Sequence, residues 1–219
     1  MYHYFFTLSF YASVICVVLM SRYTHALPLY NTDDAQITSN NTCQLEFGQT
    51  NSKTQQQLSI NPACSLHNYE LSVPINYVDR DTYAGLQIKH PFYSSERFGV
   101  AVSSGYTPKQ HQNDANWQFN IPASLYITPE FQIDANIGWY HQSKNANDMT
   151  WAIAATHDLP HAQKIALEYY SPALDPSQIQ LIWGLEVIKD QTNIYLAYGQ
   201  TLKSSVSRWM GLGFSWNFG

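Results

Sequence analysis

A histidine and a serine stand two residues apart in the stretch Gly138-Trp139-Tyr140-His141-Gln142-Ser143. In an extended strand this spacing puts His141 and Ser143 on the same face as Trp139. A serine hydroxyl becomes a nucleophile when a histidine takes its proton, and such a pair performs acyl-group hydrolysis. Lys144 follows directly, and the sequence offers no clear Asn or acidic residue on the next strand to orient the imidazole. We therefore interpret His141 first as an interfacial residue and predict that the protein is not an enzyme.

Seven charged residues occupy alternate positions of other strand-like stretches, opposite to the large apolar side chains: Glu46, Glu70, Lys89, Asp134, Lys164, Glu168 and Glu186. If these stretches close into a barrel, the seven side chains face its lumen, which is then negative on balance. Burial of unpaired charges is costly, so these groups must meet each other or water. Two interpretations stay open: a packed polar network that holds the barrel in shape, or a narrow wet pore whose acidic lining disfavours anions.

Three cysteines occur in the chain. Cys16 lies in an apolar run, whereas Cys43 precedes the first predicted strand and Cys64 follows the second. A hairpin centred between Lys53 and Thr54 puts Cys43 and Cys64 directly opposite each other, within the reach of a disulfide. An oxidising compartment favours this bond over two free thiols.

The elements that must position these side chains are strands, because apolar residues alternate with small or polar ones through most of the chain. The closing stretch shows this most clearly, since one of its faces carries Met210, Leu212, Phe214, Trp216 and Phe218. About twelve strands are predicted: Gln44 to Thr50, Thr54 to Ala63, Tyr69 to Tyr77, Thr82 to Phe92, Phe98 to Val102, Trp117 to Leu125, Phe131 to Trp139, Met149 to Ile153, Ile165 to Tyr169, Ile179 to Val187, Ile194 to Tyr198 and Trp209 to Gly219.

An even number of such strands is typical of an all-β, antiparallel, up-and-down transmembrane β-barrel, whose apolar face meets lipid. We predict this barrel for residues 42–219. Turns at 128–130, 157–163 and 189–192 would be periplasmic, and loops at 106–116, 143–148 and 171–177 would be outer loops. Trp117, Trp139 and Trp151 would then form part of an outer aromatic girdle. A secreted β-sandwich is the alternative, because it alternates in the same way.

Residues 1–26 have the pattern of a signal peptide, because an apolar run from Phe5 to Met20 precedes the small-residue site Thr24-His25-Ala26. Cleaved export is predicted, with a retained anchor as the alternative, since only His3 stands where Lys or Arg is usual. Residues 27–41 are polar and without period, so we expect a flexible N-terminal lead-in. The predicted location is the outer membrane of a Gram-negative bacterium.

Composition excludes several other classes of protein. The net charge is −5 and there is no basic run, which argues against binding of nucleic acid. The eight histidines are scattered rather than set at the spacing of metal ligands, so no metal site is predicted. Gly-rich phosphate-binding loops do not occur, and no cofactor is predicted. The mature sequence has no run of about 18 apolar residues that could form a transmembrane helix.

The chain from Tyr69 to its C-terminus resembles the MetA-pathway of phenol degradation family of outer-membrane β-barrel proteins. The similarity lies in Leu86-Gln87-Ile88-Lys89, in Ile133-Asp134-Ala135-Asn136-Ile137-Gly138-Trp139, in Ala166-Leu167-Glu168 and in Gly211-Leu212-Gly213-Phe214-Ser215-Trp216-Asn217-Phe218. The resemblance implies a passive channel or transporter for small, hydrophobic or aromatic compounds, and it brings no catalytic residues.

Two alternatives to this function stay open. One is a structural barrel without an open pore. The other is an outer-membrane lipid hydrolase, because His141 and Ser143 resemble the His-x-Ser motif of the phospholipase A and lipid A deacylase families. The expected partners are outer-membrane lipid, the barrel-assembly machinery during biogenesis and, for a channel, a small-molecule solute.

Overall fold

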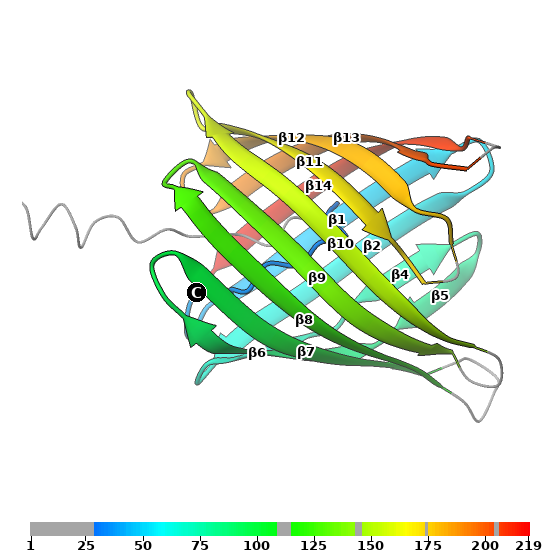
Figure 1. Cartoon of the computed structure of the whole chain (residues 1–219), viewed down its shortest axis with the longest axis horizontal. Coiled ribbons are helices and arrows are strands. Elements are labelled where there is room, and N and C mark those ends of the chain that lie inside the picture. Colours follow the sequence, from blue (N-terminus) through cyan, green and yellow to red (C-terminus); the bar gives the residue numbers. More distant parts are fainter. Residues whose placement is uncertain (1–28, 109–114, 143–145, 174, 204–205) are drawn as a thin grey trace, which may run out of the picture.

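The computed structural model describes residues 29–108, 115–142, 146–173, 175–203 and 206–219. These residues form one closed antiparallel β-barrel (Figure 1). None of the described residues belongs to a helix that is long and apolar enough to cross a membrane. The strand segments are β1 (Cys43–Ser52), β2 (Gln56–Leu66), β3 (Tyr69–Ser72), β4 (Ile75–Val78), β5 (Asp81–Ala84), β6 (Leu86–Ser94), β7 (Phe98–Pro108), β8 (Ala115–Thr128), β9 (Phe131–Gln142), β10 (Ala146–Leu159), β11 (Gln163–Ser171), β12 (Gln178–Ile188), β13 (Thr192–Thr201) and β14 (Arg208–Phe218).

These segments make up twelve strands, because two of the strands are interrupted. β3 and β4 are halves of one strand: both pair with β2, and Val73 N keeps a hydrogen bond to β2 across the break at Pro74. β5 and β6 are halves of the next strand, separated by Gly85. A Cβ at Gly85 would lie 2.6 Å from the Thr107 hydroxyl and 2.9 Å from the Tyr106 carbonyl oxygen, so only glycine permits this close approach to β7. The predicted strand number is confirmed.

The first and last strands close the barrel. β1 pairs with β14 along one edge and with β2 along the other, and Phe47 lies opposite Phe214 in the closing pair. The remaining strands pair with their neighbours in the sequence, so the sheet is a meander. This closing pair supplies the two terminal strands with ladder partners, as a barrel in lipid requires.

The two faces of the barrel wall differ in the way that the alternation predicted. Large apolar side chains are exposed on the outer face, as Ile137 (55%), Leu167 (52%) and Leu212 (47%) show. The inward side chains between them are buried, as Glu168 (0%) and Ser215 (1%) show. A β-sandwich would bury its apolar face, so the exposed apolar surface supports the barrel over the sandwich.

Tight turns join β2 to β3, β6 to β7, β8 to β9, β10 to β11 and β12 to β13 at one end of the barrel, which we call the turn end (Figure 1). In the β10–β11 turn, His161 and Ala162 have φ values of 63° and 58°, a conformation whose twist matches that of the flanking strands. The three predicted short turns all lie at the turn end. That this end faces the periplasm stays a prediction. The predicted outer loops at 106–116 and 143–148 contain residues 109–114 and 143–145, which lie outside the described residues.

Cys43 and Cys64 form a disulfide, as predicted from the hairpin register. They stand directly opposite each other in the β1–β2 ladder, with 4.0 Å between their Cα atoms. The bond therefore fixes the turn-end start of β1, where the chain enters the barrel wall.

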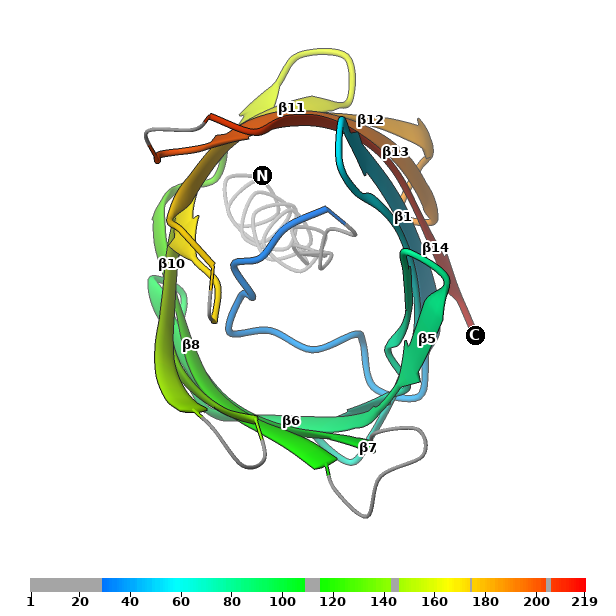
Figure 2. The same ribbon diagram turned by 90° about the vertical axis from the view of Figure 1, so that its right-hand side faces the viewer.

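Residues 29–41, which we call the lumen segment, run through the interior of the barrel before the chain enters β1 (Figure 2). Leu29 and Ala35 are buried, with 6% and 3% of their surface exposed. Residues 27–41 were predicted to be a flexible lead-in. For residues 29–41, which the structure describes, this placement corrects the prediction. The segment is ordered by hydrogen bonds to the inner wall, and such partners leave no periodic pattern in the segment's own sequence.

Candidate functional site: a polar lumen crossed by the lumen segment

An apolar contact holds the start of the lumen segment. Leu29 packs in a buried cluster with Ala166, Ile182, Tyr195 and Ala197, which lie on the inner faces of β11, β12 and β13. This part of the inner wall is apolar, whereas the lumen of such a barrel is usually polar. The contact with Leu29 removes part of this apolar surface from water, which stabilises the position of the segment.

Glu168 of β11 accepts the largest group of hydrogen bonds from the lumen segment. Its Oε1 atom accepts from Asn31 N (2.9 Å), from the Thr32 hydroxyl (2.5 Å) and from Thr32 N. Its Oε2 atom accepts from the Gln180 amide, which also donates to the Leu29 carbonyl oxygen (2.9 Å). A fully buried carboxylate is thus supplied with donors by the segment and by the neighbouring strand.

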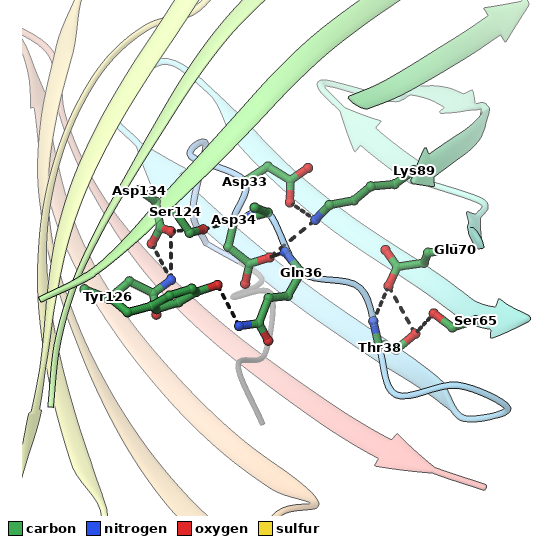
Figure 3. A network of polar contacts seen from close by, with 12 residues as sticks. Asp33, Asp34, Gln36, Thr38, Ser65, Glu70, Lys89, Ser124, Tyr126 and Asp134 are labelled. Atoms are coloured by element: carbon green, nitrogen blue, oxygen red, sulfur yellow. Dashed lines mark hydrogen bonds and ion pairs between the residues drawn. The ribbon is translucent and has the colours of Figure 1, made fainter. Parts of the chain in front are cut away.

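Lys89 of β6 anchors the middle of the segment from the opposite wall. Its Nζ atom lies 2.6 Å from Asp33 Oδ1 and 3.4 Å from Asp34 Oδ1 (Figure 3). Asn136 of β9, with its amide oriented to satisfy both groups, donates to Asp33 O (2.7 Å) and accepts from Asp33 N (2.8 Å). The predicted inward cation therefore pairs with two carboxylates that the sequence analysis had placed outside the barrel.

A third contact joins the segment to β8 and β9. Ala35 N donates to the Ser124 hydroxyl (2.8 Å), and this hydroxyl donates to Asp134 Oδ1 (2.6 Å). Beside it, the Gln36 amide donates to the Tyr126 hydroxyl (2.6 Å), as Figure 3 shows. Asp134 acts through Ser124, because it fixes the hydroxyl that receives the segment's N–H.

The end of the segment is held at the turn end. Thr38 donates to Glu70 Oε2 from its backbone N (2.7 Å) and from its hydroxyl (3.1 Å), and that hydroxyl also contacts Ser65 (Figure 3). Asn41 N then donates to the Ser65 carbonyl oxygen (2.9 Å). The lumen segment is thus attached to several different parts of the barrel wall.

The predicted inward residues divide into two groups and one further residue, Glu46, whose Oε2 atom accepts from the Asn61 amide (3.1 Å). Glu70, Lys89, Asp134 and Glu168 meet at the lumen segment through the contacts above. Lys164 and Glu186 lie nearer the turn end, where Lys164 Nζ is 3.9 Å from Asp158 Oδ1 and Glu186 Oε1 accepts from Asp190 N (2.6 Å). The structure shows the packed polar network that was one interpretation of these charges, with the lumen segment as its centre.

The lumen remains acidic after these pairings. The wall contributes Glu46, Glu70, Asp134 and Glu168, the segment contributes Asp33 and Asp34, and Lys89 is the cation among them. Burial raises the pKa of Asp33 to about 6, although the ammonium of Lys89 opposes this rise. Carboxyl groups nevertheless outnumber the ammonium group of Lys89 around the segment.

Two cavities lie inside the barrel beside the segment. One has a volume of about 460 Å³ and the other about 870 Å³. Tyr30, Asn31, Glu46 and Asn61 line both, so these residues stand where the two cavities meet. The segment narrows the lumen without filling it.

Sequence reasoning missed the partners that the lumen segment provides, above all Thr32, Asp33, Asp34 and Thr38. The apolar inner-face residues Ala166, Ile182 and Ala197 were the available sign, because they interrupt a polar lumen lining that would otherwise face water.

His141 lies on β9 and has an orienting partner that the sequence analysis did not find. Its Nδ1 atom is 2.8 Å from Oδ1 of Asn147, which stands directly opposite on β10. With an amide oxygen as the acceptor, Nδ1 is the donor of this hydrogen bond. The sequence analysis expected no Asn on the next strand that could orient the imidazole. That expectation was wrong, because the β9–β10 register places Asn147 opposite His141. Ser143 lies outside the described residues.

No cluster of His, Cys, Asp and Glu that could hold a metal ion occurs in the part of the chain that the structure describes.

Comparisons with known proteins agree with the barrel fold. The chain is similar to the KdgM porin in complex with disordered oligogalacturonate (TM-score 0.67, 11% identity, 80% of this chain and 99% of that chain). It is similar to the NanC porin (TM-score 0.64, 9% identity, 80% and 98%). It is also similar to the outer membrane phospholipase A from Escherichia coli (TM-score 0.52, 8% identity, 87% and 95%). At these low identities, the structural similarity shows the fold alone, a β-barrel like that of outer-membrane porins.

A search of curated proteins found no significant match. The comparisons do not show the resemblance to the MetA-pathway family, which stays a prediction. A family profile matches residues 14–218, and the chain therefore belongs to the family described as Uncharacterised conserved protein UCP029691.

Proposed function

We propose that the protein is a channel of the Gram-negative outer membrane that passes small polar cations through a lumen narrowed by residues 29–41. The observation that carries this proposal is the composition of the lumen, where six carboxyl groups outnumber the ammonium group of Lys89: those of Asp33, Asp34, Glu46, Glu70, Asp134 and Glu168. A pore with low-dielectric walls and one dominant sign of charge attracts ions of the opposite sign and repels the others.

This solute class differs from the ligand of one structural neighbour. The KdgM porin was solved with oligogalacturonate, which is an acidic oligosaccharide. The acidic lining of the present barrel would repel such an anion, so the shared fold supports a channel and the side chains support a different solute.

The side chains that line the lumen also argue against two other functions: a channel for hydrophobic or aromatic compounds, and a structural barrel without an open pore. Hydrophobic or aromatic compounds, which the MetA-pathway resemblance implied, would leave the polar groups around Asn31 and Asn61 without partners. A barrel without an open pore requires that the lumen segment block passage completely. The two cavities beside the segment favour a narrow path instead.

Reversal potentials across planar lipid bilayers with a KCl gradient test the proposal directly. The purified protein should show a preference for K⁺ over Cl⁻, and Glu70→Gln should reduce that preference because it removes a lumen charge while retaining an oxygen for Thr38. Glu186→Gln is the matched control, since Glu186 lies by the β12–β13 turn. A preference for Cl⁻, or no ion current from correctly folded protein, would contradict the proposal.

The second candidate is a lipid hydrolase, and the His141–Asn147 contact is the observation that favours it. An amide oxygen that orients the imidazole through Nδ1 leaves Nε2 as the atom that would accept the proton of a serine hydroxyl, which is the role that Ser143 would need. Fatty-acid release from short-chain phosphatidylcholine should then stop in Ser143→Ala and fall in Asn147→Ala. Absence of release by the wild-type protein would remove this candidate.

A further inference from the structure

The Glu46 carboxyl group and the Asn61 amide form a part-buried pair whose hydrogen bonding is incomplete. They stand opposite each other in the β1–β2 ladder, and the Asn61 amide donates to Glu46 Oε2 (3.1 Å). Glu46 is only 6% exposed. In the part of the chain that the structure describes, Glu46 Oε1 and Asn61 Oδ1 are buried and have no hydrogen-bond partner. Buried acceptors without donors are costly and call for an explanation.

These two acceptors lie at the meeting place of the two cavities. Both Glu46 and Asn61 line the cavity of about 460 Å³ and the cavity of about 870 Å³. Tyr30 and Asn31 of the lumen segment line both as well. A solute that moves from one cavity to the other would therefore pass Glu46 and Asn61.

The charge of the surroundings selects the kind of solute. Lys89 is the cation that also lines the smaller cavity, and its ammonium already pairs with Asp33 and Asp34. Glu70 adds a further negative charge to that cavity. A group that donates several hydrogen bonds and carries a positive charge meets both requirements, and a primary ammonium does so.

We propose that Glu46 and Asn61 bind the ammonium group of a small polar amine as it crosses the lumen. This inference rests on the proposed channel function and names its solute class. The two side chains turn toward the ammonium, so that each unpartnered oxygen atom accepts one N–H, and the carboxylate supplies the opposing charge. Neutral solutes of the same size bind more weakly because they lack the charge, and acidic ones are repelled.

Calorimetric titration of the purified protein in detergent tests the site with three matched probes: glucosamine, glucose and glucuronate. Glucosamine should bind, whereas glucose should bind at least about tenfold more weakly and glucuronate should show no binding. Glu46→Gln and Asn61→Ala should each weaken glucosamine binding by about tenfold or more. Glu186→Gln, the same chemical change near the turn end, should leave binding within about twofold, and a shift in gel migration on boiling checks that each variant forms a closed barrel.

The outcomes separate this inference from the proposed function. Cation-selective current without glucosamine binding, or equal binding by wild type and Glu46→Gln, overturns the amine site and leaves the channel intact. Glucosamine binding that depends on Glu46, found in a protein without cation-selective current, keeps the site and overturns the channel. Equal binding of glucose and glucosamine contradicts the role of charge.

Discussion

At the scale of single residues, Glu168 holds the start of the lumen segment against the barrel wall. It is fully buried and accepts hydrogen bonds from Asn31, Thr32 and Gln180. Glu168→Ala leaves these donors without an acceptor inside the barrel, so the start of the segment should detach. We expect faster proteolytic cleavage within residues 29–41, measured by mass spectrometry of fragments. Glu186→Ala is the control and should keep the wild-type cleavage rate.

The pH dependence of docking is a second prediction at this scale. Docked Asp33 has a pKa raised to about 6 by burial, whereas a water-exposed aspartate titrates near 3.9. The docked segment therefore binds the proton more tightly. This contribution to docking is fully present below about pH 4 and is lost as the pH rises through about 6. The charged groups that act on Asp33 are Lys89, Asp34 and Glu70.

Hydrogen exchange of the peptide containing residues 29–41, corrected for the intrinsic rate at each pH, measures this effect. Protection should increase from pH 7 to pH 4.5 in the wild type. In Asp33→Asn the increase should be smaller, because the residue no longer titrates. Protection that falls with decreasing pH in the wild type would contradict the prediction.

Residue parity predicted which charges face inward but not what they contact. Glu168 and Lys89 lie on inner faces because side chains alternate along a strand, which is a local property. Their partners Thr32 and Asp33 come from a stretch without period, and only the folded barrel brings them together. The same limit explains why Asn147 was not matched to His141, since ladder register depends on the turn that joins the strands.

At the scale of elements, the lumen segment is the part of the molecule that sets the width of the lumen. Deletion of residues 29–38 removes the contacts to Glu168, Lys89, Ser124 and Glu70 but leaves β1 and the Cys43–Cys64 bond in place. We expect a larger single-channel conductance in planar bilayers. Unchanged conductance, from a variant whose gel migration still shifts on boiling, would show that the segment does not restrict the path.

The closing strand offers a test of the lipid-facing surface. Leu212 lies near the middle of β14 with its side chain outside, and it pairs with Gln49 of β1. Leu212→Arg puts a charge in hydrocarbon at a cost of about 2 to 4 kcal/mol near the midplane. Folding into lipid vesicles should become less favourable, as urea titrations of tryptophan fluorescence measure. Thr54→Arg in the exposed β1–β2 turn is the control and should have little effect.

The elements were the part of the structure that the sequence predicted best. A period of two over long stretches identified the twelve strands, including the one that Pro74 interrupts and the one that Gly85 interrupts. The barrel follows because the large apolar side chains need an apolar environment that a protein interior of this size does not provide. The lumen segment escaped prediction since its order comes from partners far away in the sequence.

At the scale of the whole molecule, the barrel combines an apolar outer face with an acidic interior. The net charge of the chain is −5, and a substantial part of the negative charge is collected around the lumen segment. Selectivity in such a barrel comes from the summed field of several carboxylates rather than from one binding group. The field acts across the whole narrowed lumen.

A field of this kind is sensitive to salt, which gives the last prediction. The screening length falls from about 10 Å at 0.1 M to about 3 Å at 1 M ionic strength. If the lumen carboxylates produce the cation preference, the preference should be strong in dilute KCl and weaken as both sides of the bilayer are raised to about 1 M. Selection by size alone would give the same ratio at both concentrations. Reversal potentials measured at one fixed concentration ratio, but at two absolute concentrations, therefore distinguish electrostatic from steric selection in this barrel.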